Sequence, residues 1–436
     1  MAEKEPHGRA RPRRRATTLP HRRIFCSSAP AITAGSMAIN PSCGWGAKRA
    51  RTAPNGRRDW ASLPDGPAGV IADRVLDHDV ADYVRLRAVC RAWRRCCTDP
   101  RRLDALDRRL HPRHWLALPE QLSSAHCRRF LNLSTGQAIR VDLPELRGHK
   151  TLTSTPEGLL ILLHDRIRIR LLNPLTRHLI ELPSVATLLP LEHHHYRREF
   201  FNGRLIAWGS FVATESMSFL LCFCGFLGIA KPGDACWKVI PREYGSFWPR
   251  STPLTFSGRL YWVVGDDLMV LETGADPPLE VAANLCNHVY TATQSAHLVD
   301  NDGELMLLHY QPRPHFEPRP MRIDAYRVDF EKKALFPVKG FNGRALFLGK
   351  RFCFSVCTRV FPFVKGSTVY LSFDFEERIH ENVETYYVPQ QRAKPNNYII
   401  WDKSLNWPRR VLPSPHSVVD CLSLCNTFDV RGLKVV

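Results

Sequence analysis

The sequence lacks a hydrophobic run long enough to span a bilayer. Its longest nearly apolar run covers residues 217–230, which is 14 residues with two glycines. A transmembrane helix needs about 20 apolar residues, so this run predicts a pair of buried strands. We expect no membrane partner.

Motifs of catalysis and cofactor binding are also missing. The sequence contains no G-x-x-x-x-G-K-[ST], no G-x-G-x-x-G after a strand, no G-x-S-x-G and no H-E-x-x-H. Residues 192–195, Glu-His-His-His, resemble a metal site most, but adjacent histidines on an extended chain point in alternating directions. The acidic pairs at 266–267 and 376–377 are isolated. We therefore predict a protein that is not an enzyme and uses no cofactor or metal.

The cysteines do not form the pattern of a disulfide-stabilised domain. All 14 are scattered over a long chain without the density of a small secreted domain. Cys222-x-Cys224 and Cys353-x-x-x-Cys357 lack the second pair that zinc would need. We expect free cysteines packed as small hydrophobic residues in a reducing compartment.

Positive charge is abundant, but it is concentrated at one end. The net charge is +19, and residues 1–59 carry 13 Lys or Arg against 3 Asp or Glu. This basic head fits a disordered tail, a nuclear-import patch or an organelle transit peptide. Because the rest of the chain is close to neutral, a nucleic-acid partner is not expected.

Residues 60–98 have a helical pattern. Leu63-Pro64 predicts a helix start, since proline lacks an N–H that the first turn leaves unpaired. His78-Asp79 interrupts the pattern, and Asp79 or Asp82 can cap the next helix. Two apolar stripes are expected, one on each helix: Val70, Ile71, Val75 and Leu76, then Tyr83, Leu86, Val89, Cys90 and Trp93.

Residues 99–114 predict a charged amphipathic linker helix with Leu103, Leu106 and Leu110 as its apolar stripe. The helix is expected to end at Pro112. The whole segment 60–114 could also be a generic helical hairpin that caps the following domain.

From residue 115 to 436, short strand-like runs alternate with turn residues. An apolar-x-Gly-x-Leu unit recurs every 40–55 residues, with its glycines at 158, 203, 258, 303 and 343. Each glycine supplies the positive φ of a tight turn. A four-stranded unit at this period predicts a mainly β fold, a β-propeller of six or seven blades. A β-sandwich pair or a mixed α+β domain is the alternative.

Two stretches resemble known families. W-x-x-L-P at residues 60–64 with R-L-R-A-V-C-R-A-W at 85–93 resembles an F-box. N-P-L-T-R-H-L-I-E-L-P at 173–183, A-L-F-L-G-K-R-F-C-F-S-V at 345–356 and G-S-T-V-Y-L-S-F at 366–373 look like the plant F-box family with a KIB-type propeller. The sequence departs from the F-box pattern at Gly66, Pro67 and Gly69, which predict a weaker first helix.

The resemblance implies a substrate receptor of an SCF-type ubiquitin ligase, in the nucleus or the cytoplasm unless the head directs it to an organelle. The F-box would bind the adaptor subunit, and the propeller would hold an unidentified protein substrate. The residues implied to build or present the adaptor surface are Leu63, Pro64, Ile71, Val75, Leu76, Leu86, Val89, Cys90 and Trp93. An aromatic and arginine cluster, the composition of interface hot spots, makes Phe247, Trp248 and Arg250 candidates for substrate binding.

Other functions remain open. The Arg-rich head could make the chain a nucleic-acid-binding protein. A propeller enzyme acting on a glycan or lactone would need His and acidic residues around a central channel, which the repeats do not supply. The chain could also be an F-box-like propeller protein that works outside the ligase.

Overall fold

The computed structural model describes residues 60–118, 126–155, 157–165, 167–188, 210–213, 218–223, 226–240, 253–271, 279–285, 296–311, 322–349, 352–372, 383–395, 399–402, 407–412, 417–425 and 433–435. The chain divides into residues 1–58 and residues 59–436, and all of the described structure belongs to the second unit. No helix within these ranges is long and apolar enough to cross a membrane.

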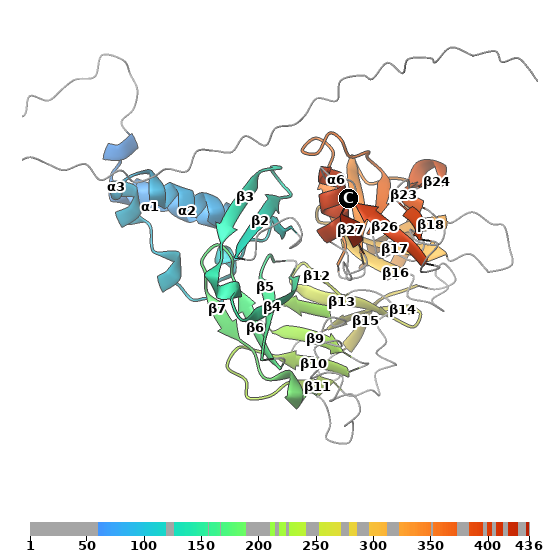
Figure 1. Cartoon of the computed structure of the whole chain (residues 1–436), viewed down its shortest axis with the longest axis horizontal. Helices are drawn as coiled ribbons and strands as arrows, with labels where there is room; N and C mark the ends of the chain where they lie inside the picture. The colour runs from blue at the N-terminus through green and yellow to red at the C-terminus, as the bar shows by residue number, and fades with distance from the viewer. Residues whose placement is uncertain are drawn as a thin grey trace, which may run out of the picture. The chain divides into compact units, whose positions relative to one another are not determined.

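The first part of this unit is a helical module, drawn in blue in Figure 1. It consists of a 3-10 turn η1 (Trp60–Ser62) and the helices α1 (Asp65–His78), α2 (Val80–Val89) and α3 (Arg91–Cys96). The two predicted helices are confirmed up to residue 89. The prediction that the second helix runs through Leu86–Trp93 is wrong, because Cys90 is extended at φ −155° and divides it.

The linker helix predicted over residues 99–114 is also wrong. The structure instead has two 3-10 turns, η2 (Pro100–Arg102) and η3 (Arg108–Leu110). Asp99, Asp104 and Asp107 each accept a hydrogen bond from the backbone N–H two residues later. Aspartate side chains compete in this way with the hydrogen bonds of a helix. The three aspartate turns therefore interrupt the segment for which the leucine spacing predicted a helix.

The rest of the unit is a β-propeller (Figure 1). Neighbouring strands follow one another in chain order in blades 1 to 5, whereas the order in blade 6 is β21-β20-β22-β23-β24. The first three blades are blade 1 with β1 (Trp115–Ala117), β2 (Cys127–Asn132) and β3 (Ala138–Asp142); blade 2 with β4 (His149–Ser154), β5 (Leu160–His164), β6 (Arg168–Leu172) and β7 (Leu179–Glu181); and blade 3 with β8 (Ser210–Ala213), β9 (Phe219–Phe223), β10 (Phe226–Ala230) and β11 (Lys238–Ile240).

The remaining blades are blade 4 with β12 (Leu254–Phe256), β13 (Arg259–Val264), β14 (Asp267–Leu271) and β15 (Leu279–Asn284); blade 5 with β16 (Ala296–Asp300), β17 (Leu305–Gln311), β18 (Arg322–Asp329) and β19 (Ala334–Pro337); and blade 6 with β20 (Arg344–Leu348), β21 (Phe354–Cys357), β22 (Thr368–Leu371), β23 (Val383–Tyr387) and β24 (Arg392–Pro395). Blade 6 differs from the antiparallel blades 2 to 5, because its β20 and β22 are parallel. Helix α6 (Val418–Cys425) and a sheet of β25 (Ile399–Asp402), β26 (Trp407–Leu412) and β27 (Leu433–Val435) follow.

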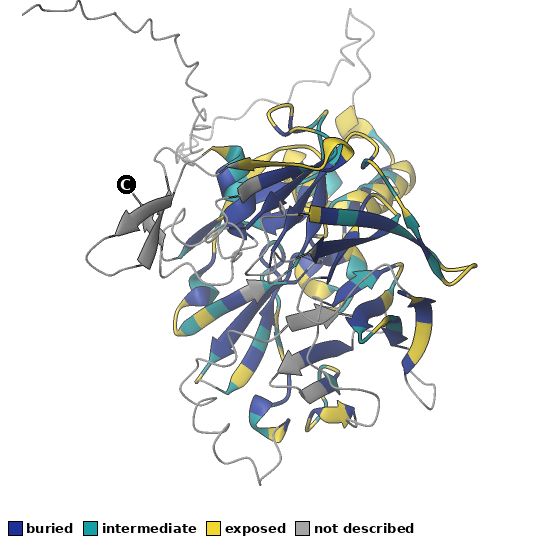
Figure 2. Cartoon of the chain, turned by 90° about the vertical axis from the view of Figure 1, so that its right-hand side faces the viewer, coloured by how far each residue is buried: buried dark blue, intermediate teal, exposed yellow. Residues whose placement is uncertain are grey.

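Six hydrophobic clusters fill the spaces between successive blades and show that the ring has six blades. Five of them join blades 1 to 6 in order. The sixth joins blade 6 back to blade 1 and includes Leu422 and Cys425 of α6. Buried residues therefore run along the strands (Figure 2). Each small sheet buries its faces only against its neighbours, which is why the ring must close.

The recurring glycines lie in the predicted tight turns. Gly158, Gly258, Gly303 and Gly343 all have positive φ, and Gly203 falls outside the described residues. Gly158 could not be replaced easily, because a Cβ there would lie 2.2 Å from the Pro112 carbonyl oxygen. This close approach brings the linker against the first hairpin of blade 2.

Candidate protein-binding surface of the helical module

Helix α1 forms despite the residues that predicted a weaker first helix. Pro64 is its N-cap, and the first helical hydrogen bond runs from Ala68 N to Pro64 O at 3.1 Å. Pro67 lies before that bond, among the first-turn residues whose N–H groups have no partner within the helix, so its missing N–H costs nothing. Gly66 and Gly69 have open space around them, since a Cβ at either position would meet no atom within 4 Å. No close packing requires these two glycines.

The other two helices begin with side-chain caps. Asp79 accepts a hydrogen bond from Ala81 N at 2.7 Å, which confirms the predicted cap of α2. The Cys90 sulfur accepts one from Trp93 N at 3.4 Å and caps α3. Because cysteine is not a usual capping residue, the pattern gave no sign of this second break.

A hydrogen bond joins the two ends of the module. The Trp93 indole N–H donates to the Trp60 carbonyl oxygen at 2.9 Å, and Leu63 N donates to the same oxygen at 3.4 Å. The turn that leads into α1 is thus fixed against α3. The two F-box-like motifs, residues 60–64 and 85–93, are therefore joined in space where Trp60 meets Trp93.

The module has a small core of its own. Leu76 is only 2% exposed and packs with Ala72, Val80, Tyr83 and Leu110. Val75 and Leu86 are partly buried against the same cluster. The Tyr83 hydroxyl donates to Thr98 O at 2.8 Å, which closes the core below α3. Leu76 can therefore support an adaptor surface only by holding the helices in place.

The remaining predicted adaptor residues reach the surface to different degrees. Leu63, Ile71, Cys90 and Trp93 are half-buried, and Pro64 is exposed. Val89 is 69% exposed, which is the highest value among the exposed large hydrophobic residues in the described ranges.

Three exposed apolar side chains were not among the predicted site residues. Trp60 and Val70 are each 55% exposed and Val84 is 40% exposed. Val70 lies opposite the buried positions Ala68, Ala72 and Leu76 on the wheel of α1, at 100° per residue. Helical spacing alone would have put Val70 on the outer face, but the predicted apolar stripe of the first helix includes it.

The module is attached to the propeller by a carboxylate. Both Asp79 oxygens lie 3.1 Å from the Trp115 indole nitrogen of blade 1, and Oδ2 also accepts from Asn132 Nδ2 at 3.0 Å. The same side chain caps α2. One residue thus starts a helix of the module and binds two side chains of the first blade. The guanidinium of Arg85 adds a contact over the Trp115 ring, with 6.0 Å between Cζ and the ring centroid.

The linker forms a second attachment, to blade 2. Asn173 Nδ2 donates to Leu110 O at 2.8 Å, and both residues are buried. A ring nitrogen of His178 lies 3.1 Å from Arg101 O. Leu175 of the same blade packs against the core of the module. The two attachments make the helical module continuous with the first two blades.

Two titratable side chains are buried beside this attachment. Burial, with help from Arg108 and Arg113, lowers the pKa of His111 to about 4. Within the described part of the chain neither ring nitrogen of His111 has a hydrogen-bond partner. Burial raises the pKa of Glu157, which lies next to Gly158. Both groups are held in surroundings that favour their neutral forms.

The predicted substrate residues Phe247, Trp248 and Arg250 lie outside the described residues. The same is true of residues 192–195 and 376–377. Trp237 and Trp262 lie between blades. The Cys353 thiol is buried, and burial raises its pKa to about 12, so it is a core residue. In the ranges that the structure describes, no group of three His, Cys, Asp or Glu side chains could hold a metal ion.

Solved structures similar to the chain include "Dihydro-heme d1 dehydrogenase NirN in complex with DHE", at 13% identity and a TM-score of 0.25, with 48% of this chain and 43% of that chain covered. "YCF48 bound to D1 peptide" matches at 12% identity and a TM-score of 0.26, with 48% and 60% covered. The chain thus spans less than two thirds of either structure. No curated protein matches it.

Family models give the more specific result. The model of the F-box domain matches residues 62–104, which contain α1 to α3 and the first linker turn. The model of the KIB1-4 beta-propeller matches residues 130–402, from blade 1 through blade 6 and β25. The chain belongs to the KIB1-4 beta-propeller family and carries an F-box domain ahead of its propeller.

Proposed function

We propose that this protein is a substrate receptor of an SCF-type ubiquitin ligase, in the nucleus or the cytoplasm. Its F-box binds the adaptor subunit, and its propeller holds a protein substrate. The observation that carries the proposal is the exposure of Trp60, Val70, Val84 and Val89 on an F-box module of three short helices. Apolar side chains that a small helical unit leaves outside its own core are typical of an interface with another protein.

The receptor would work by proximity and would need no catalytic group of its own. Binding the substrate and the ligase together raises the effective concentration of a substrate lysine near the loaded conjugating enzyme. The attachments at Asp79 and Asn173 support this mechanism, because a module continuous with the first two blades keeps the two binding surfaces at a constant separation.

Co-precipitation of the adaptor subunit with the full chain tests the proposal. The first variant is Leu63→Ala with Pro64→Ala, and the second is Val89→Asp, which puts a charge on the most exposed of these residues. We expect both to lose most of the bound adaptor. A matched control is Val239→Ala with Val281→Ala, two exposed valines on the propeller strands β11 and β15, which should bind as the parent does.

Melting temperatures distinguish a lost interface from a lost fold. Val89 is far outside the core of the module, so Val89→Asp should melt with the parent protein. If the parent chain fails to capture the adaptor, the receptor function is wrong. If Val89→Asp binds as the parent does, the exposed apolar residues are not the adaptor surface.

A further inference from the structure

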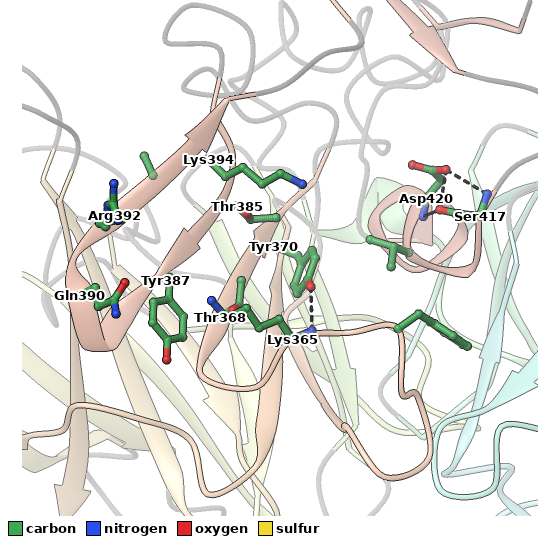
Figure 3. Close-up of a pocket in the computed structure, with 13 residues that line it drawn as sticks. Lys365, Thr368, Tyr370, Thr385, Tyr387, Gln390, Arg392, Lys394, Ser417 and Asp420 are labelled. Atoms are coloured by element: carbon green, nitrogen blue, oxygen red, sulfur yellow. Dashed lines mark hydrogen bonds between the residues drawn. The ribbon is translucent and has the colours of Figure 1, made fainter. Parts of the chain in front are cut away.

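Blade 6 carries an open pocket of about 490 Å³ (Figure 3). Its floor is one face of β22, β23 and β24, and its sides are the loop before β22 and the start of α6. The side chains that decide its chemistry are Lys365, Tyr370, Thr385, Tyr387, Arg392 and Lys394. Pockets of this size hold part of a peptide or a small molecule.

Strand register arranges these side chains in two rows across the sheet. Tyr370 is paired with Thr385, and Thr385 with Lys394. Thr368 is paired with Tyr387, and Tyr387 with Arg392. Because alternate residues of a strand share a face, both rows point to the same side of blade 6.

This face becomes open toward the outer strands. Tyr370 on β22 is buried in the cluster that joins blade 6 to blade 1 and α6. Blade 1 has three strands where blade 6 has five, so β23 and β24 continue past their neighbour. Lys394 and Tyr370 lie between β24 and the start of α6 in Figure 3.

The pocket is strongly cationic. Lys365, Arg392 and Lys394 are exposed. Within the part of the chain that the structure describes, none of them forms an ion pair with a carboxylate. The Lys365 ammonium lies 3.6 Å from the centre of the Tyr387 ring. Asp420 is the one acid among the described residues of the lining, and its carboxylate already accepts hydrogen bonds from the backbone and hydroxyl of Ser417.

The spacing of the cations suits an extended anionic peptide. Arg392 and Lys394 are two residues apart on one strand, which places them about 7 Å apart. Alternate side chains of an extended peptide repeat at that same distance. Two acidic side chains of such a peptide can therefore each face one of the two cations. The Thr385 hydroxyl of the floor can donate to the same oxygens.

We propose that this pocket binds an extended segment of the protein substrate that carries carboxylates or phosphates at alternate positions. The inference rests on the proposed function, in which the propeller holds that substrate. Guanidinium and ammonium groups form charge-assisted hydrogen bonds with either type of anion.

Fluorescence anisotropy with short labelled peptides tests the inference. The peptides carry glutamate, phosphoserine or glutamine at the same alternate positions. The proteins are the full chain, its variant Arg392→Glu with Lys394→Glu, and the charge-matched variant Lys231→Glu with Lys238→Glu. Lys231 and Lys238 are both exposed on blade 3. Lys231 directly follows β10, and Lys238 is the first residue of the outer strand β11. The basic head attracts every anion, so the informative quantity is the difference between the two variants.

We expect the blade 6 variant to bind the glutamate peptide about tenfold more weakly than the parent, because two charge-assisted contacts become repulsive. The blade 3 variant should bind it as the parent does, and the glutamine peptide should not bind. A phosphoserine peptide that binds more tightly than the glutamate peptide identifies phosphate as the anion, and the reverse order identifies carboxylate.

Three results would overturn the inference. The first is equal weakening of glutamate-peptide binding in both variants, and the second is binding of the glutamine peptide as tight as that of the glutamate peptide. The third is displacement of the labelled peptide by a lower concentration of single-stranded oligonucleotide than of unlabelled glutamate peptide. Adaptor co-precipitation is measured on the same proteins. It should be unchanged by the blade 6 variant, since Arg392 and Lys394 lie on the propeller. Loss of adaptor binding in every protein would reject the receptor function and would leave the peptide result to be judged by itself.

Discussion

The helical module and the propeller treat apolar side chains in opposite ways. The module exposes Trp60, Val70, Val84 and Val89 within about thirty residues. Among the described residues of the propeller, the exposed large hydrophobic residues are Leu179, Val239, Val281, Phe330 and Phe363, which are widely separated along the chain. A closed ring can bury nearly all of its apolar surface between blades, and three short helices cannot. The module therefore depends on neighbours, one of which is the propeller itself.

Removing the Asp79 carboxylate, which attaches the module to the propeller, should have the largest effect on stability. Asp79→Ala removes the cap of α2 and the acceptor for Trp115 and Asn132, so we expect a loss of about 3 kcal/mol in the free energy of unfolding. Urea unfolding of the full chain measures it. Asp79→Asn, which can still cap and accept, should lose less.

Asp82→Ala is the matched control for that experiment. Asp82 lies on the same helix and forms an exposed ion pair with Arg85, so its loss should cost less than about 0.5 kcal/mol. If Asp79→Ala unfolds like Asp82→Ala, then the module is stable without the attachment, and the contrast with the propeller is weaker than the structure indicates.

His111, which is buried beside the attachment of the linker to blade 2, should make stability depend on pH. Its pKa is about 4 in the folded protein against 6.5 ordinarily, so between these values the unfolded chain takes up a proton that the folded chain does not. Stability should therefore fall as the pH decreases, by about 2 kcal/mol from this residue between roughly pH 7 and pH 5.

His111→Phe should remove that contribution and flatten the slope of unfolding free energy against pH. It should also stabilise the protein at neutral pH, because both ring nitrogens lack partners where the structure is described. His78→Phe, which replaces an exposed histidine at the end of α1, should keep the parent slope. An unchanged slope in His111→Phe would show that the residue is protonated in the folded state.

The smallest effect is expected inside the module. Gly66→Ala with Gly69→Ala should raise the free energy of unfolding by about 1 kcal/mol, since alanine favours the helix and its Cβ meets no atom within 4 Å. Gly148→Ala has equal space but a φ of +74°, so it should not stabilise. Equal melting temperatures for the double variant and the parent would show that α1 is already limited by its packing.

Regular spacing allowed most of the fold to be predicted. The glycines at 158, 258, 303 and 343 mark turns with positive φ, and the period of 40–55 residues gave the propeller. The blade number needed the six clusters between blades, which depend on contacts far apart in sequence. The linker failed because leucine spacing suggested a helix where Asp99, Asp104 and Asp107 form turns.

The binding surfaces were less predictable. Periodicity identified the apolar residues of the module, but it could not separate Leu76 in the core from Val70 and Val89 outside it. The cationic pocket is formed by residues from 363 to 420, and only strand register brings Arg392 beside Tyr387. Neither residue belongs to a motif, so no sequence pattern points to them.

The closure of the ring has a consequence for how the protein is made. The Cys425 thiol of α6 donates to Ala117 O of β1, 308 positions earlier, and the same seam covers Leu116 and Leu131. A ribosome must therefore synthesise nearly the whole propeller before the first blade acquires its last neighbour. During that time the nascent chain presents an uncovered apolar edge to chaperones. Any product that stops before blade 6 keeps that edge, which gives cellular quality control a direct way to recognise it.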